Sequence, residues 1–170
     1  MIFGIRRVVI TGFMAAGKTT LATMLARRLN SSAIDLDSVI SEREGRSVPA
    51  LIDEKGEAEF RDAETRALRT VLDMGMSRVI ALGGGAWTIA DNRQVIANYN
   101  CLTVWLDTPF ELCWQRIRSS GEIRPLARDL AATRSLYHGR RTFYALADLH
   151  VSASEKPEMR RVVNEIARAI

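Results

Sequence analysis

A glycine-rich stretch near the start of the chain has the spacing of a phosphate-binding loop. Residues 12–19 read GFMAAGKT, which fits the pattern G-x-x-x-x-G-K-S/T. In such a loop the backbone N–H groups and the positive end of the following helix bind phosphate, and the lysine reaches the β- and γ-phosphates. The motif therefore predicts a nucleotide site. The predicted contacts with the nucleotide come from Gly12, Ala15, Ala16, Gly17, Lys18, Thr19 and Thr20.

Two acidic residues follow a short apolar stretch in the sequence AIDLDSVI. Asp35 and Asp37 come directly after this predicted strand, and ligands bind at the carboxyl ends of parallel strands. Two residues apart in an extended chain, their side chains are expected to point the same way. One of the two carboxylates could then hold water on Mg²⁺, and the other could orient a substrate hydroxyl or accept its proton. The alternative is that Asp37 only caps the helix that follows.

A helical stretch and a run of glycines add candidate substrate contacts. Arg61 and Glu64 lie three residues apart in GEAEFRDAETRAL, a spacing that allows an ion pair on one helix face. The pair could equally be an exposed one. Gly83, Gly84 and Gly85 follow the apolar stretch VIAL, and three glycines suggest a ligand resting directly against the backbone. The alternative for this run is a flexible turn.

Four arginines in the second half of the chain suit charge neutralisation. Residues 119–130 lack any periodicity, so we expect a mobile lid that carries Arg124, with Arg116 at the end of the helix before it. The alternative is a surface loop with incidental arginines. In LYHGRRTFYALAD a guanidinium such as that of Arg140 or Arg141 could bind an anionic substrate by paired hydrogen bonds.

Strands are predicted to alternate with helices around these residues. The predicted strands are Arg7–Thr11, Ala33–Ile34, Arg78–Leu82, Cys101–Leu106 and Leu149–Val151. The predicted helices are Lys18–Leu29, Asp37–Glu44, Val48–Lys55, Glu57–Asp73, Asp91–Tyr99, Pro109–Ser119, Leu130–Ala145 and Pro157–Ile170. Gly45, Gly56 and Gly75 are predicted to end helices. This alternation predicts an α/β fold of three layers, with a five-stranded parallel sheet covered on both faces.

Composition limits the classes of protein that this chain can belong to. A chain of 170 residues, 47% hydrophobic and 26% charged, fits one globular domain spanning residues 1–170. We expect no membrane span and no signal peptide, and so a cytoplasmic protein. The net charge of +4 reflects scattered arginines with no stacking aromatics among them, which disfavours nucleic acid as a partner. Cys101 and Cys113 are expected to be buried and unpaired.

The motifs in their order resemble the shikimate kinase family. They read GFMAAGKT, DLD, GEAEFRDAE, LGGG, VWLDTPFELCWQRIRSSGEIRPLA and RRTFYALAD, and they extend over about residues 8–151. The resemblance implies a P-loop kinase fold and the ATP-dependent phosphorylation of the 3-hydroxyl of shikimate, with Mg²⁺ as cofactor. The partners that it implies are ATP and shikimate, and we expect a monomer.

The resemblance also assigns roles to particular residues. It makes Lys18, Asp37 and Arg124 catalytic, Thr19 and Asp35 the metal residues, and Arg116 a contact of the adenine. It places Asp37, Arg61, Gly83, Gly84, Gly85 and Arg140 around shikimate. The family pattern has a proline after its arginine that RRTFYALAD lacks, and Arg134 competes with Arg140 for the same role.

Two other functions stay open at this point. One is a kinase for another small hydroxy acid, of the gluconate type. The other is a catalytically silent relative that binds ligand without turnover.

Overall fold

The five strands in the described part of the chain form one parallel sheet. The computed structural model describes residues 6–75, 77–121, 127, 129–152 and 156–170. The strands are β1 (Val8–Thr11), β2 (Ala33–Asp35), β3 (Val79–Ala81), β4 (Leu102–Leu106) and β5 (Leu149–Val151), in the order β2-β3-β1-β4-β5. Every neighbouring pair is parallel. The predicted five-stranded parallel sheet is therefore confirmed.

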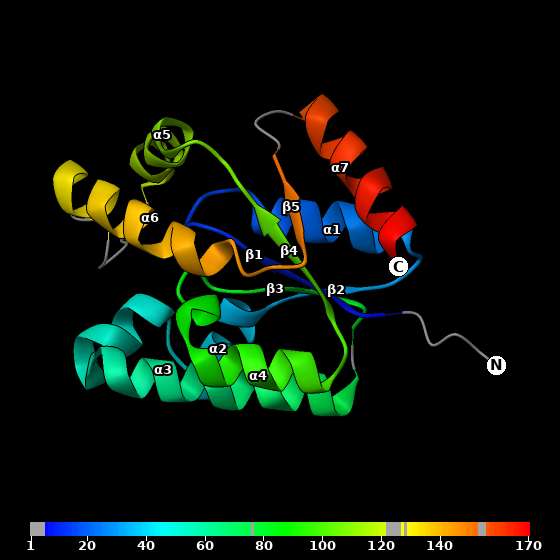
Figure 1. The fold of residues 1–170 in the computed structure, drawn as a ribbon. Helices are drawn as coiled ribbons and strands as arrows, with labels where there is room; N and C mark the ends of the chain where they lie inside the picture. The colour runs from blue at the N-terminus through cyan, green and yellow to red at the C-terminus, as the bar shows by residue number, and fades with distance from the viewer. Residues whose placement is uncertain (1–5, 76, 122–126, 128, 153–155) are drawn as a thin grey trace.

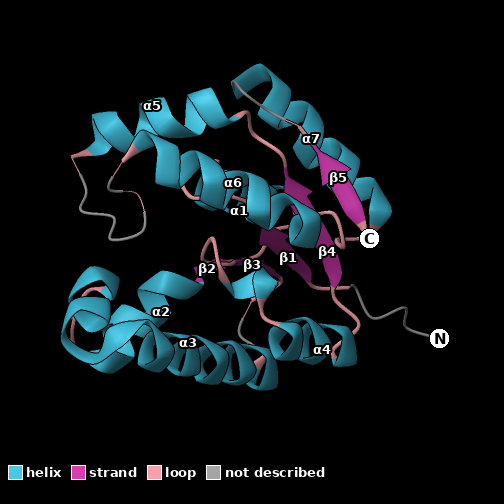
Figure 2. Cartoon of the chain, turned by 60° about the vertical axis from the view of Figure 1, so that its left-hand side comes forward, coloured by secondary structure: helices cyan, strands magenta, loops and turns pink. Residues whose placement is uncertain are grey.

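Helices cover both faces of this sheet. They are α1 (Lys18–Arg28), α2 (Leu36–Glu44), α3 (Val48–Met74), α4 (Ala90–Asn98), α5 (Phe110–Ser120), α6 (Leu130–Tyr144) and α7 (Lys156–Ala169), with a short 3₁₀ turn η1 (Ala86–Thr88). Both views show α1 and α7 on one side of the sheet and α3 and α4 on the other (Figures 1 and 2). The central strands β1, β3 and β4 are buried along their whole length, as strands covered on both faces must be.

Glycines end or break the helices where the sequence predicts it. Gly45 and Gly75 take the left-handed conformation at the ends of α2 and α3, with φ of 64° and 59°. Gly56 interrupts α3 with φ 87° and ψ 166°, so the two helices predicted on either side of it form one bent element. The 3₁₀ turn η1 was not predicted, because three residues carry no periodic signal.

Parallel strands bring their carboxyl ends to one edge of the sheet, and the predicted site residues follow those ends. The loop of residues 12–17 follows β1, Asp35 ends β2, and Gly83 comes two residues after β3.

Among the described residues no helix is both long and apolar enough to cross a membrane. Both cysteines are buried and free, as predicted.

Candidate active site

A cavity of about 1240 Å³ opens at the carboxyl edge of the sheet. It exceeds the range of roughly 300–1,000 Å³ that is usual for one small ligand, so two substrates can lie in it side by side. Most of the predicted site residues line it. They are Ala15, Gly17, Lys18, Thr19, Thr20, Asp35, Asp37, Arg61, Gly83, Gly84, Gly85, Arg116 and Arg140.

Two of the predicted site residues that the structure describes do not line the cavity. Ala16, a residue of the loop itself, is fully buried. Gly12 lies against β4, where a Cβ atom would come within 2.6 Å of the Leu106 carbonyl oxygen, and its φ is +146°. Gly12 is therefore required by the packing of the loop on the sheet. Arg124 lies outside the described residues, as does half of the predicted lid.

Side chains hold the carbonyl groups of the phosphate loop. The Lys18 ammonium, which is largely buried, donates a hydrogen bond of 2.8 Å to the Phe13 carbonyl. Arg116 donates from one nitrogen to the carbonyls of Ala15 and Ala16, at 3.2 and 3.1 Å. Ala15 has a φ of +59°, a conformation that costs a residue with a side chain roughly 1 kcal/mol. These contacts fix the peptide planes of the loop in one arrangement.

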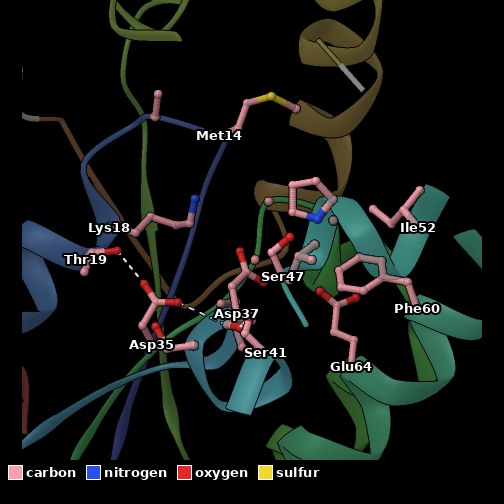
Figure 3. Close-up of a pocket in the computed structure, with 18 of the residues that line it drawn as sticks. Met14, Lys18, Thr19, Asp35, Asp37, Ser41, Ser47, Ile52, Phe60 and Glu64 are labelled. Atoms are coloured by element: carbon pink, nitrogen blue, oxygen red, sulfur yellow. Dashed lines mark hydrogen bonds between the residues drawn. The ribbon is translucent and has the colours of Figure 1, made fainter. Parts of the chain in front are cut away.

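The two aspartates lie close together, but not in the way the sequence analysis expected. β2 ends at Asp35 and α2 begins at Leu36, so Asp37 lies in the first turn of a helix and the predicted extended geometry is wrong. Asp35 caps that helix, because its Oδ1 accepts a 3.0 Å hydrogen bond from the Asp37 backbone N–H. Both side chains nevertheless face the cavity (Figure 3).

The Thr19 hydroxyl and the Asp35 carboxylate form the part of the site that suits a magnesium ion. Thr19 Oγ1 donates a hydrogen bond of 2.6 Å to Asp35 Oδ2 at the cavity wall (Figure 3). Mg²⁺ prefers oxygen ligands and is usually bound by one or two protein groups together with substrate phosphates and water. In the described part of the chain no group of three or more acidic, histidine or cysteine side chains is placed to bind a metal ion by itself, so an ion here would need ligands from a bound molecule or water. The donor set therefore fits Mg²⁺ bound with a nucleotide.

Arg61 is held by two carboxylates of its own helix. Its Nη1 donates to Glu64 Oε2 at 2.8 Å and its Nη2 donates to Glu57 Oε1 at 3.1 Å. Burial lowers the pKa of the guanidinium, but Glu64 and Glu57 outweigh this and the net shift is upward. The guanidinium also lies 4.8 Å from the centre of the Phe60 ring. α3 thus presents a positioned cation to the cavity.

Glu64 is a site residue that the sequence analysis treated only as an ion-pair partner. Its side chain is completely buried and lines the cavity. Burial raises the pKa of Glu64 to about 7, although Arg61 opposes this shift. Its second oxygen, Oε1, has no hydrogen-bond partner among the described residues and points at Gly83. The FRDAE spacing was the only sequence signal for it.

Arg140 enters the cavity from α6, and Arg134 does not. Arg140 is buried, with 8% of its surface exposed, and it forms a hydrogen bond with the Tyr144 side chain. Tyr144 in turn donates to the Gly84 carbonyl at 2.5 Å. Arg134 instead pairs with Glu111 of α5 at 3.0 Å, away from the cavity lining. The preference for Arg140 agrees with this geometry.

Among the described residues Arg140 has no direct carboxylate partner, although the more distant Glu57 offsets part of its charge. In the described part of the chain no carboxylate lies within ion-pair distance of its guanidinium. Burial lowers the pKa of Arg140, and the nearby Arg61 cation lowers it further. Buried charges in proteins are normally paired. The pair of guanidinium groups is therefore suited to an anionic ligand.

The three glycines make room for site side chains. A Cβ atom on Gly83 would lie 2.7 Å from Asp37 Oδ1 and 2.9 Å from Glu64 Oε1. A Cβ atom on Gly85 would collide with the Arg61 guanidinium, and one on Gly84 would come within 3.2 Å of the Met14 nitrogen. The sequence analysis attributed these glycines to contact with a ligand. The close approach of Asp37, Glu64 and Arg61 is a second reason for them.

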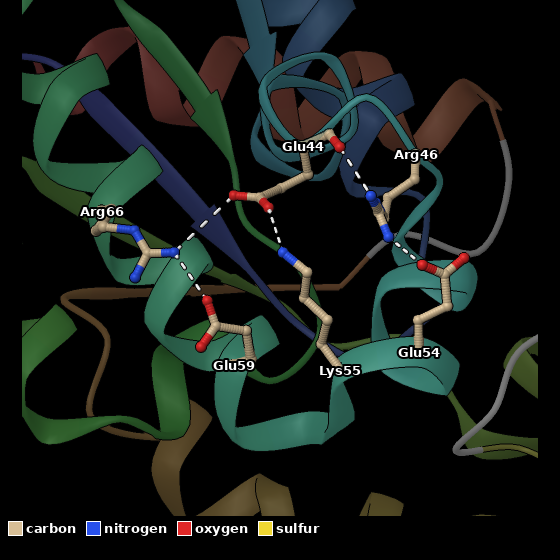
Figure 4. A network of polar contacts seen from close by, with 6 residues as sticks. All are labelled: Glu44, Arg46, Glu54, Lys55, Glu59 and Arg66. Carbon is tan, nitrogen blue, oxygen red and sulfur yellow. Dashed lines mark hydrogen bonds and ion pairs between the residues drawn. The ribbon is translucent and has the colours of Figure 1, made fainter.

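The far wall of the cavity is apolar and is carried by the first part of α3. Val48, Pro49, Ile52 and Phe60 line it. Ile52 and Phe60 face the phosphate loop across the cavity (Figure 3). An ion-pair network joins this wall to α2 (Figure 4). Its pairs are Glu44–Lys55 at 3.6 Å, Glu44–Arg66 at 3.9 Å, Glu59–Arg66 at 3.4 Å and Arg46–Glu54. Because they lie on both sides of Gly56, they restrain the bend of α3.

Comparison with known proteins gives a consistent result. The family model described as shikimate kinase matches residues 14–170. The shikimate kinase of Persephonella marina is 32% identical over 161 residues, covering 95% of this chain and 96% of the relative. That of Geobacter sulfurreducens is 39% identical over 165 residues, covering 95% and 89%.

A solved structure agrees with these relatives. The shikimate kinase from Acinetobacter baumannii, determined in complex with shikimate, matches with a TM-score of 0.85 and 30% sequence identity. The match covers 97% of this chain and 92% of that one. The likeness therefore extends over nearly the whole chain.

Proposed function

The chain belongs to the shikimate kinase family and transfers a phosphoryl group from ATP to shikimate, and we propose that the residues gathered in the cavity carry out this reaction. The phosphate loop would bind ATP at one end. Asp37, Arg61, Arg140 and the three glycines would bind shikimate at the other. A gluconate-type kinase and a silent relative are not favoured by the family match.

The observation that carries this assignment is the pair of guanidinium groups facing the cavity. Arg140 is buried without a carboxylate partner among the described residues, and Arg61 lies near enough to lower its pKa. Shikimate has one carboxylate, which would supply the missing negative charge by charge-assisted hydrogen bonds. Its hydroxyl groups would then extend toward Asp37 and the phosphate loop.

The transfer step would be in-line. The 3-hydroxyl oxygen of shikimate forms a bond to the γ-phosphorus while the bond from that phosphorus to the β,γ-bridging oxygen breaks, and ADP leaves. Asp37 would orient the hydroxyl and accept its proton. Lys18 would stabilise the negative charge that spreads over the transferred group.

Thr19 and Asp35 are the residues that would hold Mg²⁺. Their hydroxyl and carboxylate oxygens already lie 2.6 Å apart at the cavity wall. When bound with ATP, the ion neutralises phosphate charge and helps to orient the γ-phosphoryl group. Arg116 would lie against the adenine, since it lines the cavity on the phosphate-loop side.

Several expectations from the sequence complete the proposal. Arg124 would close over the phosphates from a lid of about residues 119–130. Residues 1–170 would act as one domain, since all five strands join one sheet. A monomer in the cytoplasm stays a prediction.

A substrate panel tests the proposal. ADP release coupled to a spectroscopic readout would be measured with ATP and shikimate, quinate or gluconate. We expect turnover with shikimate, and a fall in kcat of about 10²-fold or more in Asp37→Asn with ATP affinity nearly unchanged. Turnover with gluconate in place of shikimate, or nucleotide binding without turnover, would contradict it. Loss of Mg·ATP binding in Asp37→Asn would exchange the roles of Asp35 and Asp37.

A further inference from the structure

Arg141, the neighbour of Arg140, points away from the cavity into a separate cluster of polar contacts. Its Nη1 and Nη2 donate to the two oxygens of Asp107, at 2.5 and 2.9 Å. Asp107 comes directly after β4, so the two hydrogen bonds tie α6 to the central part of the sheet. Such a bidentate pair fixes direction as well as distance, because the planar guanidinium must lie in the plane of the carboxylate.

Aromatic rings surround this pair and restrict it further. The Arg141 guanidinium lies 4.8 Å from the centre of the Trp105 ring and 5.5 Å from that of Tyr137. The Tyr137 hydroxyl accepts a 2.9 Å hydrogen bond from Arg141. It donates one of 3.0 Å to the Thr108 carbonyl. Arg141 is thus held from three directions.

The segment directly after β4, Asp107 and Thr108, also lies close to the phosphate loop. Thr108, which is buried, donates from its hydroxyl to the Ala16 carbonyl at 2.9 Å. Tyr137 packs edge-on against Phe13 of the loop, with ring centres 5.1 Å apart. Asp107 and Thr108 therefore place α6 relative to the nucleotide end of the cavity.

We propose that Arg141 is a positioning residue that sets the direction in which Arg140 enters the substrate end of the cavity. Successive residues of a helix point about 100° apart around its axis. Fixing Arg141 on Asp107 therefore fixes the rotation of α6, and with it the direction of Arg140. The inference rests on the proposed role of Arg140 in binding the shikimate carboxylate.

The pair acts mainly through geometry. The side chains of Arg141 and Asp107 are 36% and 31% exposed, and partly exposed ion pairs contribute little to stability. A small rotation of α6 would nevertheless move the Arg140 guanidinium off the substrate carboxylate, and misplacements of about 1 Å are costly in active sites. We therefore expect a larger effect on shikimate binding than on folding.

The same helix offers a matched control. Arg134 also lies on α6 and pairs with a carboxylate of another element, Glu111, at 3.0 Å. Its guanidinium also lies over an aromatic ring, that of Phe110, at 4.5 Å. This pair is more exposed and lies outside the cavity lining.

The test compares Arg141→Gln, Asp107→Asn and their double variant with Arg134→Gln. We expect Arg141→Gln to raise the KM for shikimate by about 3- to 30-fold, with the KM for ATP within about twofold. Asp107→Asn should do the same, and the double variant should be no worse than either single variant. Arg141→Lys, which keeps the charge but cannot bind in bidentate fashion, should lie between wild type and Arg141→Gln. Arg134→Gln should leave both KM values unchanged.

Thermal unfolding separates positioning from simple stabilisation, with kinetics measured well below every Tm. An unchanged shikimate KM in Arg141→Gln, with or without a lowered Tm, would overturn the inference. Equal increases for both substrates would also overturn it. Arg140→Ala belongs in the same experiment: if its shikimate KM is normal, the proposed role of Arg140 fails; if it is strongly raised while Arg141→Gln is normal, only the positioning inference fails.

Discussion

The two helices that present arginines to the substrate end of the cavity do so in different ways. On α3, Arg61 is held by Glu57 and Glu64, four residues before it and three after it on the same helix. On α6, Arg140 is held by burial and by Tyr144, whose hydroxyl is bound to Gly84, 60 residues away in sequence. The first arrangement is local and the second depends on the whole fold.

This difference has a consequence for charge. The cation of Arg61 is already balanced by carboxylates, whereas that of Arg140 has no carboxylate at ion-pair distance in the described part of the chain. A substrate carboxylate therefore gains more from Arg140 than from Arg61. Removing Arg140 should therefore weaken shikimate binding more than removing Arg61. The pH dependence of the unfolding free energy should reveal what Glu64 contributes.

The largest expected effect is that of Arg140→Ala. Loss of the buried guanidinium should raise the KM for shikimate strongly. The lost binding free energy should be about 2 to 5 kcal/mol, because the substrate carboxylate loses its partner in a desolvated pocket. The KM for ATP should stay within a few fold. Arg134→Ala is the control and should act weakly on both. A strong shikimate defect in Arg134→Ala with a mild one in Arg140→Ala would show that the wrong arginine was assigned.

Arg61→Ala should have a smaller effect on shikimate and a larger one on folding. We expect the KM for shikimate to rise by a factor that corresponds to about 1.5 to 3 kcal/mol of binding free energy, since one charged hydrogen-bond donor is lost. The variant also leaves Glu64 buried without its partner, so the free energy of unfolding in urea should fall more than in Arg140→Ala. Equal stability of the two variants would remove the distinction between α3 and α6.

The pH dependence of stability isolates Glu64. Its pKa is raised to about 7 in the folded protein, above the ordinary value near 4.5, so the folded state takes up a proton more readily than the unfolded state. The cost of the buried charge is therefore fully present above pH 7 and is relieved as the pH falls toward 4.5. Relative to Glu64→Gln, the wild type should gain about 1 to 3 kcal/mol of unfolding free energy between pH 8 and pH 5. A constant difference between the two proteins would contradict this.

The smallest expected effect is that of Glu57→Gln. The Glu57 side chain is 51% exposed, and exposed pairs four residues apart on a helix contribute only about 0.3–0.5 kcal/mol. Stability and the KM for shikimate should both change little. A defect as large as that of Arg61→Ala would mean that Glu57, rather than Glu64, holds the arginine.

The contrast between α3 and α6 also explains what the sequence could predict. The phosphate loop, the helix breaks at Gly45, Gly56 and Gly75, and the Arg61–Glu64 pair all depend on residues close together in sequence, and all were predicted. The predicted conformation of Asp37 was wrong because Asp35 caps α2, so that the helix begins at Leu36, one residue earlier than expected. The complete burial of Glu64 depends on how α3 packs on the sheet, which spacing alone does not indicate.

The order of the strands has a consequence for how the protein is made. Val8 of β1 pairs with Val79 of β3 and with Leu102 of β4, partners that lie 71 and 94 residues further along the chain. During synthesis β1 can therefore pair with both β3 and β4 only after more than half of the chain has been made. Contacts so distant in sequence slow folding, because a long loop must close before they form. The phosphate loop, which precedes β3 and β4 in the chain, should therefore reach its final shape only after these two strands have joined β1.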